Sequence, residues 1–211
     1  MGRRIVVGKK RSAQAPTHEP CTKGGHLDAG HHGGNSSEVF LDTAAILQEL
    51  AIAPGQTIVD AGCGDSYMAM VFYKVLNGTG RVYAVDQAVE ALETLMNETK
   101  GTGLYPLVAD ITRSTPIMDS SIDLIYLSNV FHVFAKNQIQ GFNREVRRLL
   151  KPGGRLAIVE LKKQPSLIGP PLELRYAPKE LERAIDLPPV GLAEVGPYHY
   201  LQIFQKTRKG I

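Results

Sequence analysis

Polar side chains close several short apolar runs of this sequence, and their types and spacing suit the binding of a polar ligand. Asp60, Asp86 and Asp110 each follow such a run, and Ser128 with Asn129 follows a fourth. In an open parallel sheet the carboxyl ends of the strands share one edge, and ligands bind beyond that edge. We therefore expect these acids and amides to line one rim and to hold a ligand by hydrogen bonds.

The first of these positions begins a glycine-containing turn, residues 60–67 (DAGCGDSY). Gly62 and Gly64 let the backbone bend sharply and approach a ligand closely, and the expected helix after them presents unpaired N–H groups. A nucleotide-type cofactor fits such a turn, and the alternative is a tight turn that needs glycine only for its geometry. A dinucleotide-binding turn has a third glycine where Tyr67 stands here, so the turn favours a ligand without phosphates.

The acid at the end of the second apolar run stands 22 residues after Gly64. At this distance Asp86 can accept hydrogen bonds from both hydroxyls of a ribose. The alternative interpretation is a cap for the helix that follows, and one carboxylate can serve both roles.

From residue 38 onwards, apolar runs alternate with segments that carry an apolar residue every three or four positions. The runs predict strands and the segments predict helices. The expected strands cover residues 57–59, 81–85, 105–109, 122–127, 156–161, 191–195 and 199–204. The expected helices cover residues 37–50, 68–76, 89–101, 139–150 and 178–185.

The expected strands are apolar throughout rather than alternating, which predicts burial on both faces by helices. The fold class is therefore α/β, with a doubly wound, mostly parallel, seven-stranded Rossmann-like sheet. The last two strands are joined by a turn at Gly196 and Pro197, which predicts an antiparallel C-terminal hairpin.

The composition is that of an ordinary globular protein, with 211 residues, 43% of them hydrophobic, and a net charge of +3. Residues 1–37 hold much of the basic excess and lack periodic apolar positions, so we interpret them as a flexible or lid-like arm before a domain over residues 38–211. Cys21 and Cys63 are far apart, and no apolar run approaches the ~20 residues of a membrane span. We expect a cytoplasmic protein with reduced thiols and without a membrane span.

Five segments, in this order, resemble the motifs of class I S-adenosylmethionine-dependent methyltransferases. They are residues 59–64 (VDAGCG), Asp86, residues 109–111 (ADI), residues 123–132 (DLIYLSNVFH) and residues 149–156 (LLKPGGRL). The resemblance covers about residues 38–205 and is nearest to the small-molecule branch that includes the ubiquinone/menaquinone C-methyltransferases. It implies S-adenosylmethionine as cofactor and S-adenosylhomocysteine as product.

The resemblance also implies a role for each matched residue at the methionine end of the cofactor. Asp60 is expected to hold the amino group, and the backbone of Gly62, Cys63 and Gly64 to contact the methionyl part. The chain departs from the pattern at Ser66, where many members have a further glycine; we expect its hydroxyl to reach the cofactor carboxylate.

At the nucleoside end, the resemblance assigns the ribose to Asp86 and places Gln87 beside the adenine. Asp110 is expected to hydrogen-bond the adenine amino group, with Ile111 packed on the ring. The methyl-transfer site is expected to be lined by Ser128, with Asn129 beside it.

Methyl transfer is an in-line displacement at an activated sulfonium, so the enzyme mainly supplies proximity and alignment. A base is needed only when the acceptor carries a proton of high pKa, and His132, just past the fourth strand, is the catalytic candidate. The alternative is an imidazole packed under a loop. We expect residues 170–176, with Glu173, Arg175 and Tyr176, to form one wall of an open or small acceptor pocket.

We expect the acceptor to be a small molecule. A protein or nucleic-acid methyltransferase is the second hypothesis, but a base-directed enzyme would carry Asn/Asp-Pro-Pro-aromatic where residues 128–131 read SNVF. The third is a cofactor-binding protein without catalysis. The sequence leaves open whether the chain acts alone or as a homodimer.

The arm contains four imidazole groups and one thiol, and it is interpreted as a lid or disordered segment, with a substrate gate or a metal site as alternatives. Its spacings match no structural zinc pattern, so we assign no metal. The groups concerned are His18, Cys21, His26, His31 and His32.

Overall fold

The computed structural model describes residues 40–99, 101–166 and 168–207. Within these residues, seven strands form one sheet in the order β3-β2-β1-β4-β5-β7-β6. The strands β1 to β5 run parallel, β7 runs antiparallel to β5, and β6 runs antiparallel to β7. Their bounds are β1 Thr57–Ala61, β2 Arg81–Asp86, β3 Leu104–Val108, β4 Ile122–Ser128, β5 Leu150–Leu161, β6 Pro189–Glu194 and β7 His199–Gln205. The predicted fold class and C-terminal hairpin are confirmed.

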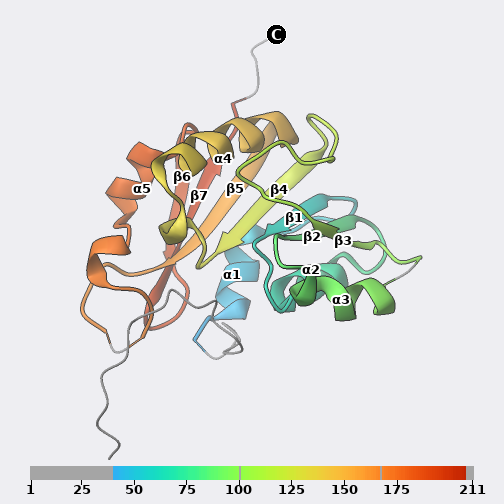
Figure 1. Ribbon diagram of the computed structural model, residues 1–211, viewed down its shortest axis with the longest axis horizontal. Helices are drawn as coiled ribbons and strands as arrows, with labels where there is room; N and C mark the ends of the chain where they lie inside the picture. Colours follow the sequence, from blue (N-terminus) through green and yellow to red (C-terminus); the bar gives the residue numbers. More distant parts are fainter. Residues whose placement is uncertain (1–39, 100, 167, 208–211) are drawn as a thin grey trace, which may run out of the picture. The chain divides into compact units, whose positions relative to one another are not determined.

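Helices cover both faces of this sheet (Figure 1). One apolar core lies between the sheet and α1, α2 and α3, and a second lies between the opposite face and α4 and α5. The helices are α1 Thr43–Leu50, α2 Tyr67–Leu76, α3 Val89–Glu98, α4 Lys136–Leu149 and α5 Pro178–Ala184, with short 3₁₀ turns η2 Phe131–Val133 and η3 Leu172–Leu174.

The expected burial of every strand on both faces is wrong for the two edges of the sheet. In β3, Tyr105 and Val108 are exposed, and in β6, Val190 and Leu192 are exposed. These strands have a neighbour on one side only, and the helices cover them incompletely. The central strands β1, β4 and β5 carry the buried apolar runs that the sequence predicts.

The first described helix starts later than predicted. It begins at Thr43 because Asp42 caps it, with the Asp42 carboxylate accepting from the Ala45 backbone N–H at 3.0 Å. An acceptor side chain at this position satisfies one of the free N–H groups of a helix start. Phe40 therefore precedes the helix, and the predicted cap, Ser37, lies outside the described residues.

The fifth strand is longer than predicted, because residues 151–154 (KPGG) belong to it rather than to a turn. Leu150 pairs with Ile122, and a register shift follows before Leu124. Lys151 forms a 2.7 Å ion pair with Asp123, so its side chain ties this end of β5 to β4. Helix α4 ends at Leu149, directly before the strand.

Candidate functional site

The sheet register brings the predicted strand-end residues to one rim. Asp60 of β1 is opposite Tyr126 of β4, so Ser128 lies one position beyond the last paired residues of these two strands. Asp86 ends β2 opposite Val108, and Asp110 follows two residues later. The carboxyl ends of four neighbouring strands thus carry the predicted polar groups.

The glycine turn after β1 is fixed to the end of β2 by backbone hydrogen bonds. The N–H groups of Gly62 and Cys63 donate to the Val85 carbonyl at 2.7 and 3.1 Å, and the Gly64 N–H donates to the Asp86 carboxylate at 3.0 Å. Gly62 has a φ of +67°, and a Cβ there would lie 2.7 Å from Val130. A side chain at Gly62 would therefore collide with the loop after β4.

Gly64 differs from Gly62 in its surroundings. Its φ is +49°, but a Cβ there would meet no atom within 4 Å. Space is therefore open at this point of the turn, beside the Asp86 carboxylate. That opening is where a ligand can approach the backbone.

Ser66 also lies in the left-handed region, with a φ of +64°, which explains why a glycine suits this position. Its side chain is only 2% exposed, and its hydroxyl donates to the Cys63 sulfur at 3.6 Å. The hydroxyl is thus engaged inside the turn rather than turned to the rim. Burial raises the pKa of the Cys63 thiol, so the thiol stays protonated and serves as packing.

Asp60 is the most unusual acid of the rim. It is 3% exposed, and its Oδ2 has no hydrogen-bond partner among the described residues. Burial raises the pKa of Asp60 to about 7, and the nearby carboxylates of Asp65 and Asp86 add to the rise, while a hydrogen bond from the Ala69 backbone opposes it. A buried carboxyl with an unused acceptor fits a cationic group such as the ammonium of an amino acid.

Two more unpartnered polar atoms lie at the neighbouring end of β4. They are Ser128 Oγ and Asn129 Oδ1; both are buried and have no partner at hydrogen-bond geometry among the residues that the structure describes, although the Ser128 side chain is near enough to the Tyr126 hydroxyl to oppose the rise in pKa that burial causes there. Asn129 is held in the left-handed region, at a φ of +56°, and its backbone N–H donates to the Val159 carbonyl. Leaving such atoms unpaired costs about 1–3 kcal/mol each, so a polar ligand fits this end of the sheet.

The acids at the end of β2 and just after β3 already accept hydrogen bonds from the residues that follow them. Asp86 Oδ1 accepts from the Ala88 N–H at 2.9 Å at the start of α3, so the helix-capping alternative is also present. Asp110 accepts from the backbone and hydroxyl of Thr112 at 2.8 and 2.6 Å. Each carboxylate oxygen has two lone pairs, so both acids keep acceptor capacity for a ligand. Gln87 is exposed, whereas Ile111 is buried.

His132 lies on η2, just past the end of β4, and is bound to an acid that sequence reasoning missed. His132 Nδ1 is 2.9 Å from Glu160 Oε2, and the His132 backbone N–H donates to Glu160 Oε1 at 3.3 Å. Glu160 is 1% exposed and stands near the end of β5. Glu160 follows an apolar run, as Asp60 does, so the strand-end criterion applied to the fifth strand would have found it.

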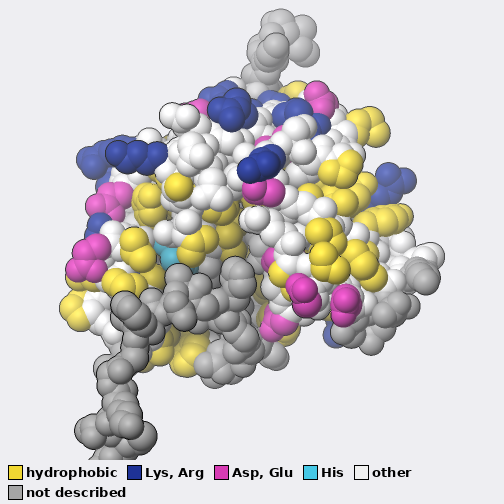
Figure 2. Space-filling model, viewed as in Figure 1, with side chains coloured by type: hydrophobic (Ala, Val, Ile, Leu, Met, Phe, Trp, Pro, Cys, Tyr) yellow, Lys and Arg dark blue, Asp and Glu magenta, His cyan; other side chains and the backbone are white. Residues whose placement is uncertain are grey.

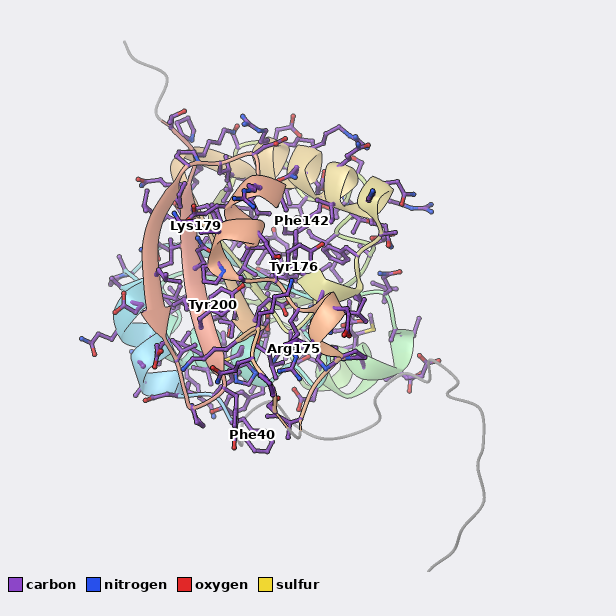
Figure 3. All side chains as sticks on the ribbon, turned by 90° about the vertical axis from the view of Figure 1, so that its left-hand side faces the viewer. Phe40, Phe142, Arg175, Tyr176, Lys179 and Tyr200 are labelled. Carbon is purple, nitrogen blue, oxygen red and sulfur yellow. The ribbon has the colours of Figure 1, made fainter. Side chains whose placement is uncertain are left out.

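A cavity of about 380 Å³ opens beside this pair. Its lining includes the predicted wall residues Glu173, which belongs to η3, and Arg175 and Tyr176, which follow η3 in the chain and lie between it and β7 in Figure 3. Figure 2 shows one histidine side chain on the viewed face, with hydrophobic side chains on either side of it. The full lining is His132, Phe134, Lys163, Glu173, Leu174, Arg175, Tyr176 and Glu180.

Arg175 orders one wall of the cavity instead of offering a free charge. Its guanidinium donates to the carbonyls of Pro170, Gln164 and Ile168 at 2.7–2.9 Å, and to the Ser166 hydroxyl at 2.8 Å. The side chain is buried, so these acceptors take the place of water. Arg175 thereby holds the loop after β5 in place beside the cavity wall to which it belongs.

The arm residues of the alternative metal site, His18 to His32, lie outside the described residues. In the described part of the chain, no group of three or more His, Cys, Asp or Glu side chains is placed to hold a metal ion. None of the described helices has the length and apolarity to cross a membrane.

Residues 59–158 match the family model described as a methyltransferase domain. An uncharacterized methyltransferase of Synechocystis is 32% identical over 143 residues, which are 67% of this chain and 64% of that protein. A ribosomal protein L11 methyltransferase of Burkholderia mallei is 28% identical over 134 residues, which are 63% of this chain and 41% of that protein. The chain thus spans less than two thirds of these relatives.

Solved structures show the same fold. A crystal structure of a SAM-dependent methyltransferase from Aquifex aeolicus superposes with a TM-score of 0.70 at 24% identity, covering 81% of this chain and 93% of that one. The sheet order, the glycine turn tied to the acid of β2, and the matched domain agree with one another. Residues 59–158 are therefore similar to a methyltransferase domain, and the chain has the fold of the S-adenosylmethionine-dependent methyltransferases.

Proposed function

We propose that this protein transfers the methyl group of S-adenosylmethionine to a small-molecule acceptor bound in the cavity at His132, and releases S-adenosylhomocysteine. One observation carries the proposal: the neighbouring strands β1 and β4 both carry, near their carboxyl ends, buried acceptors without a partner among the described residues, and His132, four residues after the end of β4, lines the cavity. The buried acceptor atoms suit the polar groups of the cofactor, and the cavity suits the acceptor molecule.

In this proposal the methionine end of the cofactor lies over β1. Asp60 pairs with the ammonium through its unused Oδ2, and the backbone of Gly62, Cys63 and Gly64 borders the methionyl part. The open space at Gly64 and the buried, unpartnered oxygen of Asp60 support this arrangement.

The nucleoside end lies over β2 and β3. Asp86 binds the ribose with the acceptor capacity left beside Gly64, and Gln87, exposed next to it, borders the adenine. Asp110 takes the adenine amino group. Ile111 is 4% exposed, so only a small part of its side chain is available to pack on the ring. Ser128 and Asn129 face the methyl-transfer site with their unpartnered oxygens.

The bound cofactor supplies a methyl group on a positively charged sulfur, which leaves as a neutral thioether and needs no acid. The chain's own residues bind, align and exclude water, and proximity of this kind supplies most of the rate. His132 is the group that can accept a proton from the acceptor. Its imidazole forms part of the cavity wall and is held there by Glu160.

A small acceptor is favoured by the size of the cavity. At about 380 Å³ it is within the range of small-ligand pockets, roughly 300–1,000 Å³. The resemblance to the branch with ubiquinone/menaquinone C-methyltransferases agrees with a small acceptor. The Burkholderia relative, named for a ribosomal protein, is the reason to test a macromolecular acceptor as well.

The acceptor class can be tested with S-adenosylmethionine tritiated in its methyl group. The protein is incubated with a cell extract that ultrafiltration has separated into small molecules and macromolecules. We expect label in the small-molecule fraction, lost with Asp60→Asn. Label confined to protein or nucleic acid would contradict a small acceptor, and no transfer despite cofactor binding would favour a non-catalytic protein.

A further inference from the structure

We infer that the acceptor carries a phenolic or enolic hydroxyl whose oxygen is methylated, that His132 takes its proton, and that Glu160 is the positioning residue that keeps His132 able to do so. The inference deepens the proposed function and rests on it. It starts from the His132–Glu160 pair, which cofactor binding does not require.

The pair fixes which imidazole nitrogen is available. Both oxygens of Glu160 are directed at His132, one to Nδ1 and one to the backbone N–H. A carboxylate only accepts hydrogen bonds, so Nδ1 carries the proton and Nε2 keeps its lone pair. None of the described residues forms a hydrogen bond with Nε2. The nitrogen that can act as a base is therefore the free one, on a side chain that lines the cavity.

Three of the four charged side chains that line the cavity beside the pair already have other partners. Lys163 forms a 2.8 Å ion pair with Glu180, and Arg175 donates to the loop carbonyls. On β7, the Tyr200 hydroxyl donates to the Tyr176 carbonyl at 2.8 Å. The exposed Glu173 completes the charged lining. The imidazole is thus left free to meet the acceptor.

A neutral imidazole base is useful for only some acceptors. Carboxylic acids are already ionised at neutral pH, and neutral arylamines attack with a lone pair before they lose a proton. Aliphatic alcohols are too weakly acidic for imidazole. A phenol, with a pKa of about 10 as in tyrosine, holds a proton that a positioned base can remove as the new bond forms.

The cavity wall suits a flat conjugated ring. Phe134 and Tyr176 line it, together with the exposed side chain of Leu174. Behind them Phe131 packs edge-on against both rings, with centroids 5.7 and 5.0 Å away, so the aromatic wall is held in place. Aromatic walls of this kind favour stacked or edge-to-face contacts with an aromatic ligand.

The reaction balances without another reactant. The acceptor oxygen forms a bond to the methyl carbon while the bond between that carbon and the sulfonium sulfur breaks, and the sulfur keeps the electron pair. The hydroxyl proton passes to His132 Nε2 and then to solvent. The products are the methyl ether, S-adenosylhomocysteine and one proton.

A matched pair of probes tests the acceptor atom. 4-Methylphenol and 4-methylaniline have nearly the same size and shape, and differ in the hydroxyl. We expect oxygen methylation of 4-methylphenol and at least ~100-fold slower labelling of 4-methylaniline. If the amine or a ring carbon is methylated instead, or if no hydroxyl probe reacts while S-adenosylhomocysteine still binds, the inference is wrong. Loss of S-adenosylhomocysteine binding would instead count against the proposed function.

The role of the pair is tested by variants. His132→Gln should lower turnover of 4-methylphenol by ~10²–10⁴-fold, but turnover of 4-nitrophenol, which ionises near neutral pH, by less than ~10-fold. Glu160→Gln should lower 4-methylphenol turnover by ~10–100-fold with unchanged S-adenosylhomocysteine affinity, and Glu160→Asp should recover part of it. Glu194→Gln, at an exposed acid of β6, is the matched control. Equal losses for both phenols would contradict a base.

A measurement that needs no acceptor distinguishes the positioning role of Glu160 from a purely structural role in holding the η2 turn. In ¹⁵N-histidine-labelled protein, NMR at alkaline pH should show His132 protonated on Nδ1, and Glu160→Gln should shift this preference. A wild-type His132 protonated on Nε2 would overturn the assigned roles of both residues.

Discussion

Asp86 accepts a 3.0 Å hydrogen bond from the backbone N–H of Gly64, which joins the end of β2 to the glycine turn after β1. The same carboxylate caps the start of α3 through Ala88. One acid thus shapes the turn, the helix start and the side of the rim where we propose that the ribose binds. Its removal therefore affects cofactor binding in two ways.

Replacing this carboxylate is expected to weaken cofactor binding. Asp86→Ala removes both the turn contact and the proposed ribose contact, and should raise the Kd for S-adenosylhomocysteine by more than ~10-fold, since a hydrogen bond to a charged group contributes about 1.5–3 kcal/mol. Asp86→Asn keeps an acceptor oxygen and should have a smaller effect. Calorimetric titration of both variants tests this, and unchanged affinity in Asp86→Ala would refute the ribose role.

The pH dependence of cofactor affinity follows from Asp60. Burial raises the pKa of Asp60 to about 7, and an ammonium pairs only with the ionised carboxylate. Affinity for S-adenosylhomocysteine should therefore rise by up to ~10-fold per pH unit between pH 5.5 and 7, and level off above it, with a proton released on binding. The Asp60→Asn variant should bind more weakly and lose this slope. The same slope in both proteins would exclude Asp60 as its source.

Stability without ligand should show the opposite trend. The folded pKa of Asp60 lies above its ordinary value of 3.8, so its contribution to stability is fully present below about pH 4 and is lost as pH rises through 7. The loss is at most about 1.4 kcal/mol per pH unit over that window. Urea unfolding from pH 4 to 8 should show Asp60→Asn gaining stability relative to the wild type as pH rises. A constant difference would show that Asp60 ionises normally.

The two glycines of the turn should respond differently to a methyl group. Gly62→Ala places a Cβ 2.7 Å from Val130 at a positive φ, whereas Gly64→Ala meets only the positive φ. We expect Gly62→Ala to cost roughly 1–3 kcal/mol more through overpacking, measured by urea unfolding. Adding Val130→Ala should recover part of this excess in Gly62→Ala and none in Gly64→Ala. Equal costs for the two glycines would contradict the close contact.

The sequence predicted the elements that depend on local pattern. Central strands such as β4 appear in the sequence as apolar runs that end in polar residues. This one pattern predicts both where the strands lie and which residues line the rim. The start of α1 at Thr43 was missed because Asp42 and Ser37 are both good caps, and only packing chooses between them. The early start of β5 depends on backbone pairing of Leu150 with Ile122 and of Gly153 and Gly154 with Lys206, which joins residues far apart in the chain.

The placement of the candidate site residues was predictable where it depends on the end of a single strand, and unpredictable where it depends on two residues that meet in the fold. His132 could be selected by its place after β4, but the meeting of its ring with Glu160 depends on the register of β4 and β5 and on the η2 turn. Likewise, the sequence after β5 does not indicate that Arg175 holds that loop in place. The groups that accept its hydrogen bonds are backbone carbonyls, which every residue has.

Cofactor binding through Asp60 is tested by calorimetric titration with S-adenosylhomocysteine and with methylthioadenosine, which lacks the amino acid part. We expect one site per chain for S-adenosylhomocysteine; Asp60→Asn should weaken the binding of this ligand by more than ~10-fold and change the affinity for methylthioadenosine by less than ~2-fold. No binding of S-adenosylhomocysteine, or an equal effect of Asp60→Asn on both ligands, would contradict cofactor binding through Asp60.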